Sequence, residues 1–198
     1  MAAIGRPPKV SHEQIIIASA RIFALNGFER TRLEDIATDL GITKGAIYYR
    51  FPSKKLLLEE VHSALLKRAL ELVKPTLTEK RDPISKLRIL VNAHLQVQDE
   101  LPHHSTTWLQ RIASQDHTEV EGVRKLREEY EAVWIKVLQN FEKSSKDLKL
   151  LTNLIFGALN GTHIWFHPGR SLSREDLKEY AASWVVYGVT KIAGTSKK

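Results

Sequence analysis

The sequence predicts an all-α protein of nine helices, and three observations support this fold class. Apolar residues recur three and four positions apart along most of the 198 residues, which is the spacing of one helix face. Ser, Thr or Asp precedes most of these runs, and Gly or Pro follows them. No segment has a convincing strand pattern. The expected helices span residues 11–26, 31–40, 44–51, 53–73, 82–101, 103–117, 119–143, 145–166 and 173–192.

The first expected helix begins at Ser11, which forms a capping box with Gln14. Its body is apolar through Leu25, and Gly27 ends it because glycine adopts the left-handed conformation without penalty. This helix is therefore expected to form the core of a small N-terminal domain.

Residues 31–51 have the pattern of a helix, a sharp turn and a second helix. Thr31 and Glu34 have the spacing of a capping box, and an apolar face follows them. Gly41 is suited to end this helix in the left-handed conformation. Ile42 can fill the angle between two helices, and Thr43 is a cap for the next one. The pattern predicts a helix-turn-helix.

The second helix of this motif is polar for a buried element. Its adjacent Tyr48 and Tyr49 cannot both be buried on so short a helix, whereas Phe51 is expected to be core. Lys54 and Lys55 follow in the first turn of the next helix, where cations oppose the helix dipole, which suggests an anion nearby. This arrangement fits insertion into a DNA major groove between phosphate anchors.

The stretch resembles the DNA-binding domain of the TetR family of transcriptional repressors. The shared pattern consists of Thr31, Ile36, Ala37, Gly41, Lys44, Gly45, Tyr48, Tyr49, Phe51, Ser53 and Lys54. The resemblance implies that Thr43, Lys44, Gly45, Tyr48 and Tyr49 touch bases and phosphates and that Lys54 binds phosphate. Tyr49 stands where the family usually has His, which leaves the preferred DNA sequence open.

The charge of the chain is consistent with a nucleic-acid partner. The chain has a formal net charge of +7, and residues 1–55 hold nine Lys and Arg against five Asp and Glu. We expect a basic arm at 1–10, the helix-turn-helix domain at 11–55, and a ligand-binding and dimerisation domain at 56–198. Arg6 of the arm is a candidate minor-groove or phosphate contact, although a disordered arm without such a role is the simpler interpretation. Arg32 is a further candidate DNA contact.

The long helix that starts at Ser53 connects the two domains, so a change of shape in the larger domain can move the DNA-reading head. The last two helices carry more apolar surface than one bundle needs, and small residues such as Gly157 and Gly161 permit close helix contact. We expect a homodimer through these helices, as in TetR-like repressors. Two heads about one DNA turn apart, on the order of 34 Å, would read a palindromic operator.

A regulator of this kind needs an effector, and a cavity between helices of the larger domain is the expected site. Candidate lining residues combine bulk with a polar end, although an ordinary core role is at least as good an interpretation for most of them. They are His94, Gln98, Trp108, Arg111, Trp134, Asn153, Phe156, Asn160, His163, Trp165, His167 and Arg170.

Residues 164–170, IWFHPGR, resemble the signature of a TetR subgroup that responds to acyl-CoA thioesters from fatty-acid or steroid degradation. That subgroup often has Arg where His167 stands, and Arg170 is a replacement. Arg111, His167 and Arg170 would contact the CoA phosphates while apolar residues held the acyl chain. A small aromatic or drug-like inducer is the alternative.

Other functions have weaker patterns. An enzyme would use His163 or His94 with Asp99, but no nucleophile motif, phosphate loop or metal triad accompanies them. His163 and His167 are four apart, yet no third metal ligand has a partnering spacing, and His103–His104 is interpreted as a loop pair. A pure protein-interaction bundle would not need the polar recognition helix. No catalytic residue, metal or cofactor other than the effector is expected.

Composition gives the expected compartment. The sequence has no Cys, which excludes disulfides and thiol chemistry. It shows no signal-like N-terminus and no apolar run near the length that a membrane helix requires. We therefore expect a cytoplasmic protein without a membrane partner.

Overall fold

The computed structural model describes residues 10–114, 120–141, 144–167, 169 and 172–195, and within them every regular element is a helix. The nine expected helices are present, with a one-turn helix, α5, in addition. The helices are α1 His12–Asn26, α2 Leu33–Asp39, α3 Lys44–Arg50, α4 Lys54–Val73, α5 Pro75–Thr78, α6 Pro83–Glu100, α7 Pro102–Ala113, α8 Glu121–Leu138, α9 Ser145–Trp165 and α10 Arg174–Thr195. The all-α prediction is confirmed.

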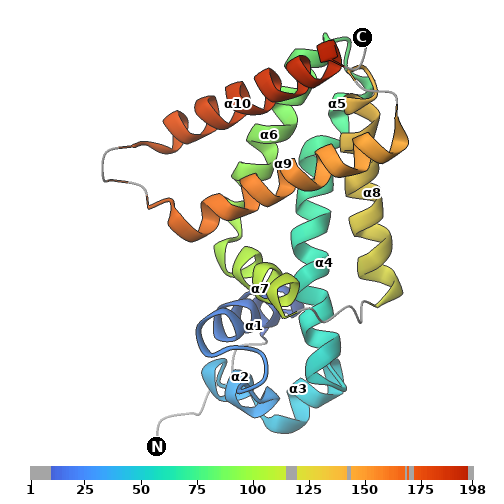
Figure 1. Cartoon of the computed structure of the whole chain (residues 1–198). Helices are drawn as coiled ribbons and strands as arrows, with labels where there is room; N and C mark the ends of the chain where they lie inside the picture. Colours follow the sequence, from blue (N-terminus) through green and yellow to red (C-terminus); the bar gives the residue numbers. More distant parts are fainter. Residues whose placement is uncertain (1–9, 115–119, 142–143, 168, 170–171, 196–198) are drawn as a thin grey trace, which may run out of the picture.

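The helices form a small head and a larger body (Figure 1). Helices α1 to α3 make the head at one end of the molecule, and α4 runs from the head into the body. Helices α9 and α10 lie along one side of the body, where α10 packs mainly on α6. Helix α7 lies between the two parts and contacts α1 as well as α4.

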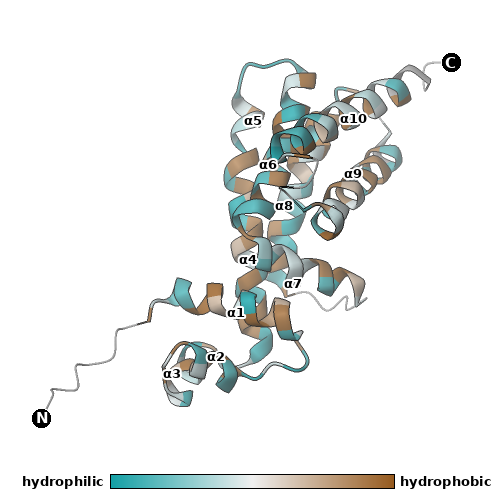
Figure 2. Ribbon diagram, turned by 90° about the vertical axis from the view of Figure 1, so that its left-hand side faces the viewer, coloured by the Kyte–Doolittle hydropathy of each residue, from teal (hydrophilic) through white to brown (hydrophobic). Residues whose placement is uncertain are grey.

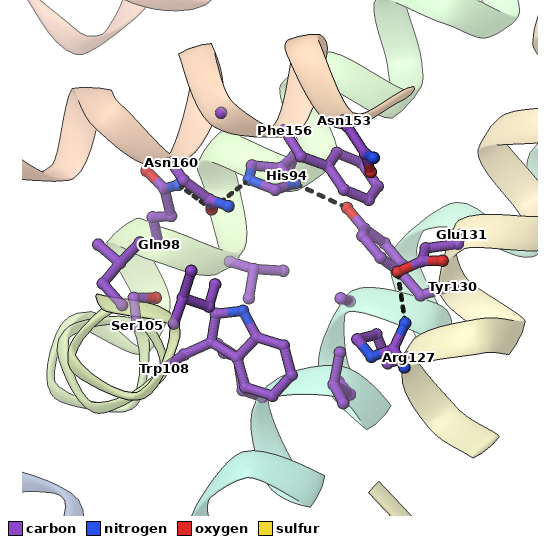
Figure 3. Close-up of a pocket in the computed structure, with 17 residues that line it drawn as sticks. His94, Gln98, Ser105, Trp108, Arg127, Tyr130, Glu131, Asn153, Phe156 and Asn160 are labelled. Atoms are coloured by element: carbon purple, nitrogen blue, oxygen red, sulfur yellow. Dashed lines mark hydrogen bonds and ion pairs between the residues drawn. The ribbon is translucent and has the colours of Figure 1, made fainter. Parts of the chain in front are cut away.

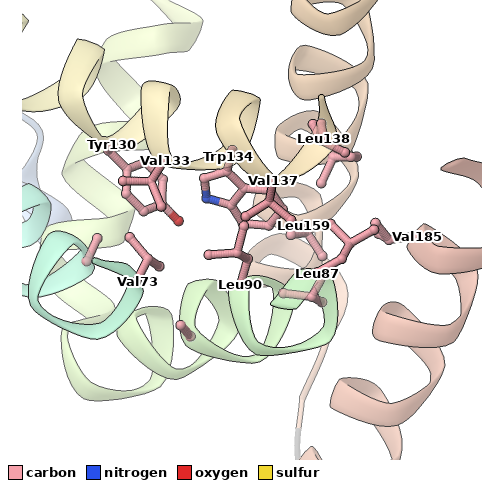
Figure 4. Packing of buried hydrophobic residues seen from close by; sticks show 14 of the residues in the cluster. Val73, Leu87, Leu90, Tyr130, Val133, Trp134, Val137, Leu138, Leu159 and Val185 are labelled. Atoms are coloured by element: carbon pink, nitrogen blue, oxygen red, sulfur yellow. The ribbon is translucent and has the colours of Figure 1, made fainter. Parts of the chain in front are cut away.

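Each part has its own cluster of buried apolar residues. The head cluster includes Ile15, Phe23, Ile36 and Ile47, all fully buried. The body cluster is built around Trp134, as Figure 4 shows, with side chains from α4, α6, α8, α9 and α10. Along α4 the change of cluster falls between Ala64 and Leu65, in the middle of an unbroken helix.

The predicted helix caps are largely confirmed. The Ser11 hydroxyl accepts from the Gln14 N–H at 3.0 Å, and the Gln14 side chain accepts from the Ser11 N–H at 2.8 Å. Hydroxyl or carboxyl caps at Thr43, Ser53 and Asp82 likewise accept the backbone N–H three residues on. These local bonds set the helix starts because they satisfy N–H groups that have no partner inside the helix.

The predicted start of α2 is wrong by one residue. Thr31 does not cap this helix, because its side chain is buried and its hydroxyl donates to the Gly27 carbonyl at 2.9 Å. Arg32 takes the cap position instead, and its backbone N–H donates to Asp35 Oδ2 at 2.8 Å. The carboxylate that bonds the cap is therefore that of Asp35 and not that of Glu34.

Two other expectations need correction. The helix expected over 119–143 ends at Leu138, where the Asn140 side-chain amide donates to the Val137 carbonyl at 2.8 Å in a turn that follows it. His103 and His104 are not a loop pair, because Pro102 starts α7 and both lie in its first turn. His104 is buried, and desolvation lowers its pKa to about 4.

Gly41 holds the turn between α2 and α3 with a φ of 63°. Replacing Gly41 with Ala places a β-carbon in the left-handed region, so we expect the free energy of unfolding to fall by about 1 to 2 kcal/mol. Urea denaturation followed by circular dichroism measures this change. The matched control is Gly122→Ala in the first turn of α8, which should leave stability unchanged or raise it by up to about 1 kcal/mol. Equal effects of the two substitutions would contradict this account of the turn.

Candidate DNA-binding surface and effector cavity

Helix α3 presents a polar face to solvent because only one of its side chains, that of Ile47, is buried in the head. Ile47 is fully buried, and Phe51 directly after the helix is 3% exposed. Tyr48 and Tyr49 are 39% and 90% exposed, which confirms that the two tyrosines are not both core residues. An exposed tyrosine pair on a short helix is available to a ligand as large as a DNA duplex.

The other sequence candidates on the head have different surroundings. Thr43, Lys44 and Gly45 are exposed at the start of α3, on the same element as Tyr48 and Tyr49, and Arg32 is exposed at the start of α2. Lys54 is partly buried, and its ammonium donates to the carbonyls of Phe28 at 2.6 Å and Glu29 at 3.2 Å. Arg6 lies outside the described residues. The structure thus brings five candidates together on α3 and its cap, whereas Lys54 already bonds to the head itself.

The body contains a cavity of about 360 Å³ that is bounded by α4, α6, α7, α8 and α9 (Figure 3). Most of its wall is apolar, with Leu65 and Ala69 from α4, Trp108 and Leu109 from α7, and Phe156 from α9. A largely apolar cavity with a few polar groups is the usual form of a small-molecule site.

A chain of hydrogen bonds crosses one wall of this cavity. His94 of α6 bonds the Tyr130 hydroxyl through Nδ1 at 2.9 Å and Asn160 Oδ1 through Nε2 at 3.1 Å. Because a carbonyl oxygen only accepts, Nε2 carries the proton and Nδ1 accepts from Tyr130. Burial lowers the pKa of His94 to about 4 and raises the pKa of Tyr130, so both groups are neutral at pH 7.

Gln98 extends this chain. Its amide nitrogen donates to the Leu159 carbonyl at 3.1 Å, and its carbonyl accepts from the Thr162 hydroxyl at 3.2 Å. Two opposite charges, Arg127 and Glu131, lie one turn apart on α8 at another part of the wall, 2.8 Å from each other. The polar groups of the wall are therefore neutral or mutually compensated.

Ser105 differs from the other polar residues of the wall. It is only 5% exposed, and its hydroxyl has no hydrogen-bond partner among the described residues. A buried hydroxyl without a partner carries a desolvation cost that a ligand atom can remove. Ser105 is thus a point where a bound molecule would gain a hydrogen bond.

Half of the sequence candidates for the effector site line this cavity. They are His94, Gln98, Trp108, Asn153, Phe156 and Asn160. Trp134 lies behind the wall as a fully buried core residue whose ring packs edge-on against His94 and Phe156. Arg111 lines a separate hollow between α7 and the head, although its guanidinium carbon lies 5.5 Å from the Trp108 ring centre.

The segment that resembles the acyl-CoA signature lies apart from the cavity. Trp165 at the end of α9 is 58% exposed, and the exposed His167 bonds the Trp165 carbonyl through Nδ1 at 2.9 Å. His163 is bound to the Thr106 hydroxyl at 2.8 Å beside a separate, smaller hollow. Arg170 lies outside the described residues. The predicted cluster of Arg111, His167 and Arg170 is therefore not assembled around the cavity by the residues that the structure describes.

Sequence reasoning missed several wall residues. The sequence indicates only a core role for Tyr130, and it does not single out Ser105, Arg127 or Glu131. The spacing of Arg127 and Glu131 at i and i+4 is that of a helix ion pair, but nothing in the sequence shows that this pair faces a cavity. Tyr130 has a phenol that needs a partner when buried, and that need was the available signal.

The described part of the chain contains no cluster of three or more His, Asp or Glu side chains arranged to hold a metal ion. Among its helices, none combines the length and apolar character needed to cross a membrane.

A helix-turn-helix head on an all-α body is the architecture of a DNA-binding regulator. Residues 15–61 match the model of bacterial regulatory proteins of the tetR family, and residues 80–189 match the tetracyclin repressor-like C-terminal domain. The chain therefore belongs to the TetR family of DNA-binding transcriptional repressors, and it is not an enzyme.

Full-length relatives agree with this assignment. The chain is 25% identical over 194 residues to the HTH-type transcriptional repressor KstR2 of Mycolicibacterium smegmatis, covering 94% of each chain. The crystal structure of the TetR family regulator PfmR from Thermus thermophilus has a TM-score of 0.74 at 26% identity, covering 88% of this chain and 97% of that one. AibR in complex with isovaleryl coenzyme A and operator DNA has the same fold, with a TM-score of 0.69 at 17% identity and coverage of 88% and 95%.

The lowered pKa of His94 predicts a stability change with pH. Between the ordinary pKa of 6.5 and about 4, the unfolded chain binds a proton at this residue that the folded protein does not. The free energy of unfolding therefore falls as the pH falls through this window, by on the order of 1 to 3 kcal/mol from His94. Urea denaturation at pH 7, 6, 5 and 4.5 measures the change. His94→Gln should show a shallower pH dependence, and an unchanged one would contradict the neutral assignment.

Proposed function

We propose that this protein is a homodimeric repressor that binds palindromic operator DNA through α3 and is released by a small lipophilic effector bound in the body cavity. The observation that carries the proposal is the combination of an exposed α3 with a largely apolar cavity of about 360 Å³ in one chain. Such a repressor acts where the DNA is, which supports a cytoplasmic location.

The DNA contacts are proposed from exposure and charge. Thr43, Lys44, Gly45, Tyr48 and Tyr49 share one exposed helix and its cap, so they can enter a major groove together. Arg32 and the arm residue Arg6 would follow the phosphates on either side. Lys54 has three N–H donors, of which two bond carbonyls, and the third would be available to a phosphate.

A second copy of the chain is proposed to cover α9 and α10. These helices expose large hydrophobic side chains in the single chain, and hydrophobic residues occupy the middle of α9 in Figure 2. The most exposed are Leu150, Leu154, Ile164, Trp165, Tyr180, Trp184 and Tyr187. So much exposed apolar surface on neighbouring helices is typical of a protein interface, and pairing two heads would let the dimer read two half-sites.

The effector is proposed to be an acyl-CoA thioester from fatty-acid or steroid catabolism. The isovaleryl coenzyme A bound to AibR supports a thioester, and the likeness to KstR2 of Mycobacterium tuberculosis, described as a ketosteroid transcriptional regulator, supports a steroid source. The apolar wall would hold the acyl group, and Ser105 would donate its hydroxyl to the thioester carbonyl. The nucleotide of CoA would lie outside the cavity, where His167 and Arg170 are candidates for its phosphates.

A small aromatic or drug-like inducer is the second candidate. It is favoured by the neutral His94 network and by the fact that Arg127 and Glu131, the charged residues of the described wall, bond each other. A ligand held by this wall alone would be uncharged and flat, with an acceptor for Ser105.

The DNA contacts are tested by replacing Lys44 and Tyr48 with Ala. Each change should weaken binding to a duplex selected from a random pool by about tenfold, because one phosphate or base contact is lost. Fluorescence anisotropy measures the affinity. Lys136→Ala, which removes an exposed charge from α8 in the body, is the control and should bind like the original protein. Unchanged affinity of both α3 variants, with folding intact by circular dichroism, would contradict the docking of α3.

The effector class is tested by a thermal-shift screen of acyl-CoA thioesters, free acids and neutral aromatic compounds. A binder at about 100 times its Kd stabilises the folded state by about 2.7 kcal/mol, which should raise the Tm by about 5 to 10 °C. Ala69→Leu narrows the cavity and should reduce that shift. Selective shifts by thioesters support the first candidate, and shifts by neutral aromatics alone support the second. An equal shift in the Ala69→Leu variant would place the ligand elsewhere.

A further inference from the structure

One carboxylate on α2 bonds two of the proposed DNA-contacting side chains on α3. Lys44 Nζ lies 2.6 Å from Glu34 Oε1, and the Tyr48 hydroxyl donates to the same oxygen at 3.2 Å. The Lys44 ammonium also lies 5.5 Å from the centre of the Tyr48 ring. The three side chains therefore form one polar cluster on the outside of the head.

Both charged members of this cluster are ionised and in contact with water. The side chain of Lys44 is 69% exposed and that of Glu34 is 36% exposed. The hydrogen bond from Lys44 lowers the pKa of Glu34, and the same bond raises the pKa of Lys44. An exposed ion pair of this kind is weak enough to be exchanged for another anion, because water and salt screen it.

DNA offers the same chemistry as Glu34. A phosphate oxygen accepts hydrogen bonds from an ammonium or a phenol as a carboxylate oxygen does, and it carries a similar charge. In the DNA-free protein, the Glu34 carboxylate takes the place that a phosphate oxygen would take beside Lys44. A Glu34 side chain left near the interface would also repel the DNA backbone.

We propose that Glu34 is a positioning residue that orders Lys44 and Tyr48 in the free protein and competes with DNA phosphate for Lys44, which limits the affinity for DNA. The inference rests on the proposed docking of α3. A second close ion pair of the head joins Arg21 to Asp39 Oδ2 at 2.6 Å and includes none of the proposed DNA contacts. It provides a control with the same change of charge on the same helix.

The test is the substitution Glu34→Gln, which removes the charge but keeps an acceptor for the Tyr48 hydroxyl. Binding is measured by fluorescence anisotropy with the full-length protein and a duplex selected from a random pool, across a series of salt concentrations. We expect affinity to rise about three- to tenfold at low salt. The logarithm of the DNA-binding constant should fall more steeply with the logarithm of the salt concentration, by up to about 0.9 in slope. The reason is that Lys44 of this variant can neutralise a phosphate without first leaving the Glu34 carboxylate.

Two further variants separate this effect from a general change of charge. Asp39→Asn should alter affinity by less than about twofold, because its partner Arg21 is not a proposed contact. Glu34→Gln should have little effect on DNA affinity in a protein that already carries Lys44→Gln, because the ammonium for which Glu34 and phosphate compete is then absent. Circular dichroism confirms that each variant is folded.

These measurements either support or overturn the competition between Glu34 and DNA phosphate for Lys44. Tighter binding and a steeper salt slope that both require Lys44 support the competition. Weaker or unchanged binding of Glu34→Gln would overturn it, as would a gain that persists without Lys44 or that Asp39→Asn reproduces. Absence of DNA binding by the unsubstituted protein would overturn the proposed function as well, whereas the preceding outcomes leave that function standing.

Discussion

The burial of α4 in two separate cores is the constraint on which the rest of the structure depends. Leu57 and Val61 of this helix are fully buried in the head, and Leu70 and Val73 are buried in the body. A single helix shared by two cores transmits displacement because packed apolar side chains do not deform continuously. We therefore expect a shift of α4 at the cavity to move the head.

The cavity borders α4 directly and is connected to the head through α7. Leu65 and Ala69 of α4 line its wall. His62, fully buried on the same helix, packs edge-on against the Trp108 ring with the ring centres 5.2 Å apart. On α7, Gln110 donates to the Ala24 carbonyl at 3.2 Å, near the end of α1. A ligand that displaces Trp108 would thus act on α4 and α7 together, and it would favour whichever head position fits the new packing.

Most helix boundaries of the head could be predicted from the sequence, because the residues that set them act locally. Thr43, Gly41 and Ser53 act within a few residues of themselves, and the structure confirms each of them. The error at Thr31 arose because two adjacent residue pairs, Thr31 with Glu34 and Arg32 with Asp35, both have cap spacing. Only the fold shows that the Thr31 hydroxyl is buried against Gly27. Because the sequence analysis assigned Glu34 to the cap of α2, it missed the bond between the Glu34 carboxylate and Lys44 of α3.

The cavity could not be predicted to the same degree, because it depends on which helix faces meet. Tyr130 and Trp134 are one turn apart on α8 and look alike in sequence, yet one lines the cavity and the other lies behind it. Trp165 belongs to a recognisable signature but is exposed at the end of α9. Six effector-site candidates line the cavity because they combine bulk with a polar end on helix faces that converge, and this convergence depends on how the body packs.

Hydrogen exchange along α4 tests the central claim most directly. If one continuous helix joins the two cores, its backbone amides from Leu57 to Val73 should exchange slowly without a break, because the helix opens only when packing is lost on both sides. Fast exchange confined to the amides between Val61 and Leu65 would show that the helix opens independently at the junction. That result would contradict transmission from the cavity to the head through α4.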